Sequence, residues 1–226
     1  MEGPIRLLQG VGTELIYSFV VIVCSLMIYF ATKEMYELSA HKGIKYFRQS
    51  FLLFAIAYFV KSFIKILLSY FGASRIIDVN PGFVGIITLF IFMYFSSLAV
   101  FYLVYSIMWK KWNGKIGILG IFHILSIAIA FISITTRQIE VLLGVNLFIL
   151  IIAIFGIYTA SKESKNKKKK NGLHVIYILL FIFWILNIIE VLIPSFLQFY
   201  QTLIYLASLG VFLTILYKVL KKSGSN

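Results

Sequence analysis

Ionisable residues inside apolar segments are the positions in this sequence where chemistry is most to be expected. Lys61 and Lys65 lie one helical turn apart in one apolar segment, and Glu190 lies in another. Charged groups are costly in hydrocarbon, so those found there usually pair and mark functional sites. Such a pair can hold an anionic or zwitterionic ligand, or respond to protonation. We therefore predict an outward-facing polar pocket in which Lys61 pairs with Glu190 or Glu14.

Other polar side chains fall at helical spacing around these charges. Residues three or four positions apart share one face of a helix, which places Tyr58 beside Lys61 and Asn187 beside Glu190. Gln201 belongs to a polar face of the last apolar segment. The predicted ligand-binding residues are Glu14, Tyr58, Lys61, Lys65, Asn187, Glu190 and Gln201.

A structural role is the alternative interpretation of the same residues. The charges would then form a buried ion pair that fixes helix register, with Lys65 extending to the outer headgroups. At about 1.5 Å per residue, Lys61 lies about 18 Å and Glu190 about 25 Å from the inner boundary. Both depths place the charges in the outer half of the bilayer.

Sequence patterns of enzymes and of cofactor sites are not found. The chain has no zinc-type His/Glu spacing, no Gly-rich phosphate loop and no serine nucleophile elbow. Cys24 is its single cysteine, so no intrachain disulfide or cysteine-based centre can form. His123 is typical of a hydrogen-bonded packing residue, because His41 and His174 lie too near the inner boundary for bis-histidine haem. We expect no enzyme activity, no cofactor and no metal.

The elements that position these residues are predicted to be transmembrane helices. The chain has 226 residues, of which 61% are hydrophobic, and a mean hydropathy of +0.98, which excludes an ordinary soluble domain. About 20 apolar residues cross a bilayer core. We predict an all-α integral membrane protein with one domain, residues 1–226. Its seven spans lie near residues 14–32, 49–71, 83–109, 116–135, 139–160, 173–193 and 197–218.

Cationic residues in the connections predict the orientation of this seven-helix bundle. One side carries Lys33, Lys42, Lys45, Arg48, Lys110, Lys111, Lys115, Lys162, Lys165, Lys167 through Lys170, Lys218, Lys221 and Lys222. The other side carries Arg6, Arg75 and Arg137. We therefore place the C-terminus in the cytoplasm and the N-terminus outside, in the cell membrane. The net charge of +13 then indicates contact with anionic headgroups at the cytoplasmic loops rather than nucleic acid.

An approximate internal repeat appears when the sequence is displaced by about 129 residues. Residues 29–34 then align with 158–163, and Lys61 aligns with Glu190. If the match is more than coincidence, spans one to three repeat as spans five to seven. The result is a 3+1+3 plan with parallel repeats.

A basic, aromatic tract joins the first two spans. Residues 28–34, 36–39 and 41–48 resemble uncharacterised archaeal seven-span membrane proteins and, more distantly, are similar to the seven-span sensor regions that precede histidine kinases. The resemblance covers about two spans and their loop. It implies a receptor- or sensor-like module, whose signal we expect to pass to a cytoplasmic or membrane partner. The alternative is a small-solute or ion transporter or channel built from two three-helix repeats.

Overall fold

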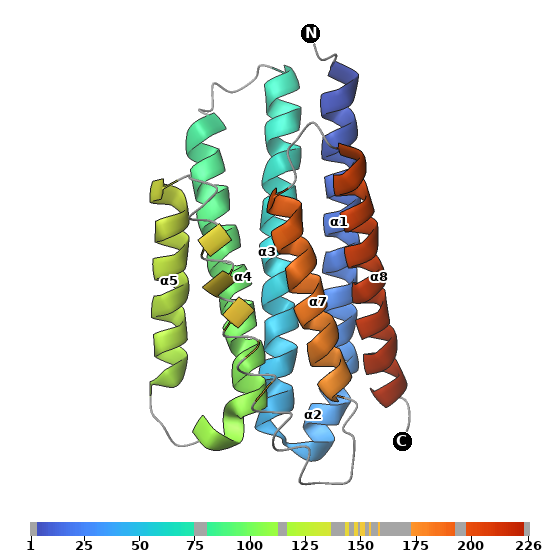
Figure 1. Ribbon diagram of the computed structural model, residues 1–226, viewed down its shortest axis with the longest axis vertical. Coiled ribbons are helices and arrows are strands. Elements are labelled where there is room, and N and C mark those ends of the chain that lie inside the picture. The colour runs from blue at the N-terminus through green and yellow to red at the C-terminus, as the bar shows by residue number, and fades with distance from the viewer. Residues whose placement is uncertain are drawn as a thin grey trace.

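A computed structural model gives an all-helical arrangement in the part of the chain that it describes. That part comprises residues 4–74, 81–112, 117–136, 173–192 and 198–223, together with positions 143, 144, 147, 148, 150, 151, 154 and 158. The helices are α1 (Pro4–Ala31), α2 (Lys33–Ser39), α3 (Lys42–Ser74), α4 (Pro81–Trp112), α5 (Ile118–Thr136), α7 (Leu173–Leu192) and α8 (Gln198–Ser223). The long helices stand side by side, with the two chain termini at opposite ends (Figure 1).

Five of the described helices are long and apolar enough to cross a membrane. The candidate spans are Gly12–Ser39, which runs from α1 through α2, and Lys42–Ser69, Gly82–Trp109, Ile118–Thr135 and Phe199–Lys221. The chain is therefore a multi-pass membrane protein. The predicted span 139–160 lies mostly outside the described residues, so the count of seven, the orientation and the repeat stay predictions.

Helix ends extend beyond several predicted spans. The span predicted at 49–71 lies within α3, which begins at Lys42, and the span predicted at 83–109 lies within α4. Hydropathy locates the part of a helix that is buried in hydrocarbon, whereas backbone hydrogen bonding continues into polar turns at the interface. The predicted spans are thus shorter than the helices that contain them.

A short helix, α2, lies in the connection between α1 and α3, which was predicted to be a loop. The long first helix breaks at Thr32, whose hydroxyl donates to the Ile28 carbonyl at 2.8 Å. Hydrogen bonds of this kind compete with the helix ladder and bend helices. α2 ends where Ala40 takes a left-handed conformation, with φ of 47°. Hydropathy alone does not detect such a short, polar helix.

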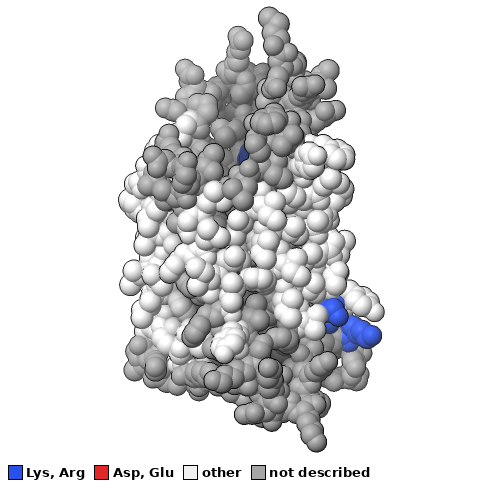
Figure 2. Space-filling view, viewed as in Figure 1, with Lys and Arg blue, Asp and Glu red and all other residues white. Residues whose placement is uncertain are grey.

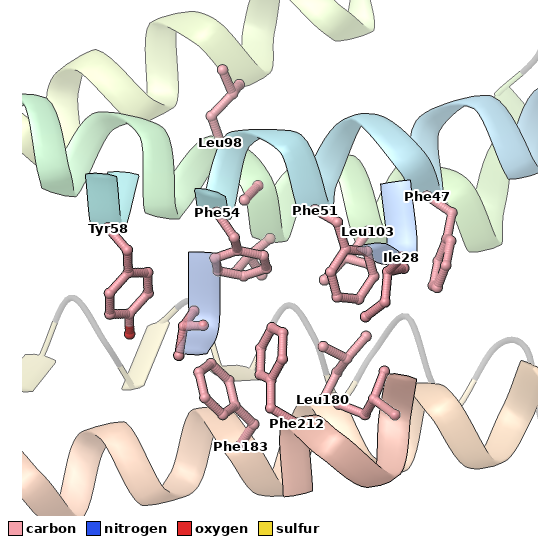
Figure 3. Close-up of a cluster of buried hydrophobic side chains, with 14 of the residues drawn as sticks. Ile28, Phe47, Phe51, Phe54, Tyr58, Leu98, Leu103, Leu180, Phe183 and Phe212 are labelled. Atoms are coloured by element: carbon pink, nitrogen blue, oxygen red, sulfur yellow. The ribbon is translucent and has the colours of Figure 1, made fainter. Parts of the chain in front are cut away.

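The buried core is largely aromatic and joins helices that are distant in sequence. Phe51 and Phe54 of α3 point toward Phe183 of α7 and Phe212 of α8 (Figure 3). The ring centroids of Phe212 lie 6.0 Å from Phe51 and 4.9 Å from Phe183. All four rings are almost completely buried, so their packing holds α3, α7 and α8 together.

Large apolar side chains also cover the outside of the bundle. Phe19, Phe59 and Leu206 each expose more than half of their surface. On the face shown in Figure 2, most described side chains are uncharged; lysine or arginine shows at the right edge of the lower half and at one small area in the upper part. The lower end carries α2 and the last turn of α8 in Figure 1. An apolar surface of this extent is expected to face lipid.

Gly43 permits a close approach between α3 and α4. A Cβ atom at this position would lie 2.8 Å from the backbone oxygen of Ser106 and 2.8 Å from the Trp109 ring. Because backbone cannot yield cheaply, Gly43→Ala is expected to lower the free energy of unfolding by about 1–2 kcal/mol. Gly210→Ala in α8 is the matched control, since no atom lies within 4 Å of its Cβ position. Thermal unfolding in lipid nanodiscs measures the stability of both variants. Equal changes in stability for Gly43→Ala and Gly210→Ala would contradict the close approach.

Candidate functional site

One carboxylate and two ammonium groups meet between α1 and α3. Lys61 and Lys65 lie four residues apart on α3, so both face α1, which packs alongside. The Nζ atom of Lys61 lies 2.9 Å from Oε1 of Glu14. The Nζ atom of Lys65 hydrogen-bonds to Oε2 of the same carboxylate. Each oxygen of Glu14 therefore binds one lysine.

The cluster is partly shielded from solvent, and its charges do not cancel. The Glu14 side chain is 17% exposed, while those of Lys61 and Lys65 are 25% and 36% exposed. With all three groups ionised, these side chains carry one net positive charge. The Glu14 carboxylate thus neutralises only one of the two ammonium charges, and charges that are partly shielded from water interact more strongly with their neighbours than surface charges do.

Four aromatic side chains, Phe92, Tyr58, Tyr17 and Tyr205, pack in sequence from Lys61 outward. The Lys61 ammonium lies 5.0 Å from the centroid of the Phe92 ring on α4, a cation–π contact. Tyr58, which is buried, packs edge-on against Phe92 and Tyr17 at centroid distances of 5.5 Å and 5.8 Å. Tyr205 of α8 packs on Tyr17 at 4.8 Å. α1, α3, α4 and α8 therefore meet around the lysine–glutamate cluster.

The structure brings together four of the seven predicted binding residues. Glu14, Tyr58, Lys61 and Lys65 are neighbours, and the predicted contact between Lys61 and Glu14 is confirmed. The Lys65 ammonium also binds Glu14, and its extension to the outer headgroups stays a prediction. Lys65 and Lys61, one helical turn apart on α3, thus share the carboxylate of Glu14 on α1.

The other three predicted residues lie on α7 and α8. Gln201 is half-buried and precedes Tyr205 by one turn of α8, which brings it toward the end of the bundle where the cluster lies. Asn187 and Glu190 belong to α7, but their side chains lie outside the described part of the structure. A contact between Lys61 and Glu190 therefore stays a prediction.

An arginine clamp at the other end of α1 was not predicted from the sequence. The Nε–H of Arg48 on α3 donates to the Tyr29 carbonyl at 3.1 Å, near the break in α1. Its guanidinium carbon lies 4.7 Å from the Tyr29 ring centroid and 5.8 Å from that of Tyr36 on α2. A cation here satisfies a helix-terminal carbonyl and opposes the negative end of the helix dipole. In the sequence, Arg48 is one of many cationic residues at the inner boundary, and it was assigned only to the orientation of the chain.

Replacing Arg48 with lysine is expected to loosen α2. Lysine keeps the charge but lacks both the Nε–H donor and the planar group that stacks on the tyrosines. Loss of one charged hydrogen bond and of the stacking corresponds to about 1–2 kcal/mol, or about tenfold faster amide exchange over residues 33–40. Hydrogen–deuterium exchange measures this, with exposed Lys45→Arg as the control. Unchanged protection of α2 in Arg48→Lys would contradict the clamp.

His123 of α5 has hydrogen-bond partners on α4, as expected of a packing histidine. Its Nδ1 lies 2.8 Å from the Tyr94 hydroxyl, and its Nε2 lies 3.4 Å from the Tyr102 hydroxyl. Within the described residues, no group of His, Cys, Asp or Glu side chains has the grouping needed to hold a metal ion.

Comparison with known proteins gives one informative relative. An uncharacterised protein from Archaeoglobus fulgidus is 30% identical over 136 residues, which are 58% of this chain and 58% of the relative. This chain is thus aligned with little more than half of that protein. No protein-family model and no solved structure matches the chain. The expected resemblance to uncharacterised archaeal proteins is confirmed, whereas similarity to histidine-kinase sensor regions stays a prediction.

Proposed function

We propose that this chain is a non-enzymatic receptor- or sensor-like membrane module, and that Glu14, Lys61 and Lys65 bind a small anionic or zwitterionic ligand. The observation that supports the proposal is the sharing of one carboxylate by two partly buried lysines. Such a cluster carries a positive charge that a ligand carboxylate or phosphate would neutralise. Asn187, Glu190 and Gln201 would complete the site from α7 and α8.

A bound anion would compete with Glu14 for the lysines, and this competition would allow α1 to move. An anion that bound Lys61 or Lys65 would weaken their contacts with Glu14 and free that part of α1 from α3. The other end of α1 is tied to α3 through Arg48, and α2 follows after Thr32 alone. A shift of α1 would therefore displace α2 at the basic end of the bundle. A ligand can drive this change only to the extent that it binds the displaced state more tightly.

Thermal-shift measurements with simple anions test this function. Phosphate, acetate, succinate and glutamate are added to the chain in lipid nanodiscs. A ligand at 100 times its Kd raises the free energy of unfolding by about 2.7 kcal/mol. We expect stabilisation by at least one of these anions to be lost in Lys61→Met and kept in Lys45→Met, where the lysine is exposed at the other end of α3. Stabilisation by none, or equal stabilisation of both variants, would leave the cluster with a register role only.

Transport is the second candidate function. It needs polar groups that continue toward the basic end of the bundle, and Tyr94, His123 and Tyr102 supply such groups between α4 and α5. In this case the charged cluster would lie on a permeation path. Solute flux into proteoliposomes that disappears in Lys61→Leu would favour transport over sensing.

A further inference from the structure

His123 is held between two tyrosine hydroxyls on the same face of α4. Tyr94 and Tyr102 are eight residues apart, so about two helical turns separate them along α4. The imidazole of His123 lies between their hydroxyls, with one ring nitrogen directed at each. Both hydroxyls and the ring are half-buried. Within the described part of the chain, α4 is the helix against which α5 packs.

Hydroxyl partners on both nitrogens satisfy every protonation state of the ring. A tyrosine hydroxyl both donates and accepts, whereas a carbonyl only accepts. With Tyr94 donating to Nδ1, the Nε2–H donates to Tyr102; the opposite tautomer reverses both roles. In the imidazolium form both N–H groups donate to the tyrosine oxygens. A change of protonation therefore leaves neither nitrogen of His123 without a partner.

Rings with hydroxyl groups continue from His123 toward the basic end of the bundle. The Tyr46 ring of α3 lies 5.8 Å from that of Tyr102 and 4.4 Å from that of Tyr105, measured between centroids. Tyr46 is four residues from the start of α3, and Tyr105 is close to the end of α4. These two helix ends lie at the end of the bundle that carries α2 (Figure 1). The rings of Tyr102, Tyr105 and Tyr46 therefore extend from His123 toward that surface.

We propose that His123 is a proton-exchange site, loaded and unloaded through the hydroxyls of Tyr102 and Tyr46. A proton from water at the basic end reaches the Tyr102 oxygen as that hydroxyl passes its own proton to Nε2, which gives the imidazolium. Release reverses these transfers, and the Nε2 proton returns to Tyr102 as the Tyr102 hydroxyl gives its own proton back to water at the basic end. Bonds made and broken are O–H and N–H bonds only, so no other reactant is needed. Among the described side chains, the titratable groups that face His123 are Tyr94 and Tyr102.

Nitrogen-15 NMR of histidine-labelled protein in lipid bilayers tests this assignment. The chain has three histidines, so the signals lost in His123→Asn identify the ring. If that variant does not fold, the double variant His41→Gln/His174→Gln isolates the same ring. Between pH 8 and pH 5, the range in which histidine commonly titrates, we expect both nitrogens to move reversibly to imidazolium shifts. A single tautomer with constant shifts over this range would overturn the proposal.

Two variants test separately how strongly His123 holds a proton and which hydroxyl passes the proton to it. Tyr102→Phe removes an acceptor from the imidazolium, so the fraction of His123 that is protonated at a given pH should fall severalfold. Tyr46→Phe keeps the ring contacts but removes the hydroxyl, so exchange should slow severalfold while the protonated fraction stays the same. An unchanged fraction in Tyr102→Phe, or an unchanged rate in Tyr46→Phe, would contradict the corresponding step. Neither result depends on ligand binding at Lys61.

Discussion

Glu14→Gln is expected to lower the free energy of unfolding by about 3 kcal/mol. Glutamine has nearly the same shape, so the loss comes from charge rather than from packing. Lys61 and Lys65 would remain close together in a shielded site with no carboxylate between them. Leaving charges unpaired in such a site is far more costly than removing the whole cluster. Reversible denaturation in nanodiscs or mixed micelles measures the difference.

Single replacements of the lysines should have smaller effects that are not additive. In Lys61→Met, Glu14 keeps its bond to Lys65, and in Lys65→Met it keeps its bond to Lys61. We expect each variant to lose about 1 kcal/mol, since a typical hydrogen bond contributes about that amount. The double variant leaves the Glu14 carboxylate without a lysine partner. Its free energy of unfolding should fall by about 3 kcal/mol, which is more than the sum of the two single effects. Additive lysine effects would contradict a shared acceptor.

A triple variant provides the matched control for this series. Glu14→Leu combined with Lys61→Met and Lys65→Met replaces every charge by an apolar group of similar length. Replacing a buried ion cluster in this way is often neutral or stabilising. The triple variant should therefore regain most of the stability that Glu14→Gln loses. If it remains as unstable as Glu14→Gln, shape rather than charge determines the effect, and the electrostatic explanation is wrong.

The charged cluster was partly predictable from the sequence. Lys61 and Lys65 share a helix face because they are four residues apart, and helical geometry determines this without tertiary information. Their partner was ambiguous between Glu14 and Glu190, because either choice depends on which helices are neighbours of α3. Hydropathy gives the positions of spans along the chain and not their order around the bundle. The contact between α1 and α3 resolves Glu14 as a partner.

The contacts of Arg48 and of His123 could not be predicted from the sequence. Arg48 contacts the Tyr29 carbonyl only because α1 breaks at Thr32 and α3 turns back beside it. Tyr94 and Tyr102 recur on one face of α4, but nothing in their spacing indicates that His123 lies opposite. Each of these contacts joins two helices through side chains, and helix register is set by packing that a single sequence does not reveal.

Phe212→Ala should destabilise the bundle by about 3 kcal/mol, whereas Phe19→Ala should have an effect below about 0.5 kcal/mol. Phe212 is completely buried, and its ring contacts Phe51 and Phe183 from two other helices. Phe19 exposes 66% of its surface on the outside of α1. Both substitutions remove the same atoms, so the difference between them isolates the contribution of packing.

In a lipid bilayer, the comparison of Phe212→Ala with Phe19→Ala measures how much side-chain packing contributes to helix association. Helices separated within a bilayer still keep their side chains in hydrocarbon, so burial of Phe212 gains little from leaving water. What the alanine loses is close contact with neighbouring rings, together with the cost of the cavity that remains. Reversible denaturation in a bilayer-like environment measures both variants. Equal destabilisation by Phe19→Ala would mean that α1 packs against protein where it is expected to face lipid, and the assigned membrane surface would then be wrong.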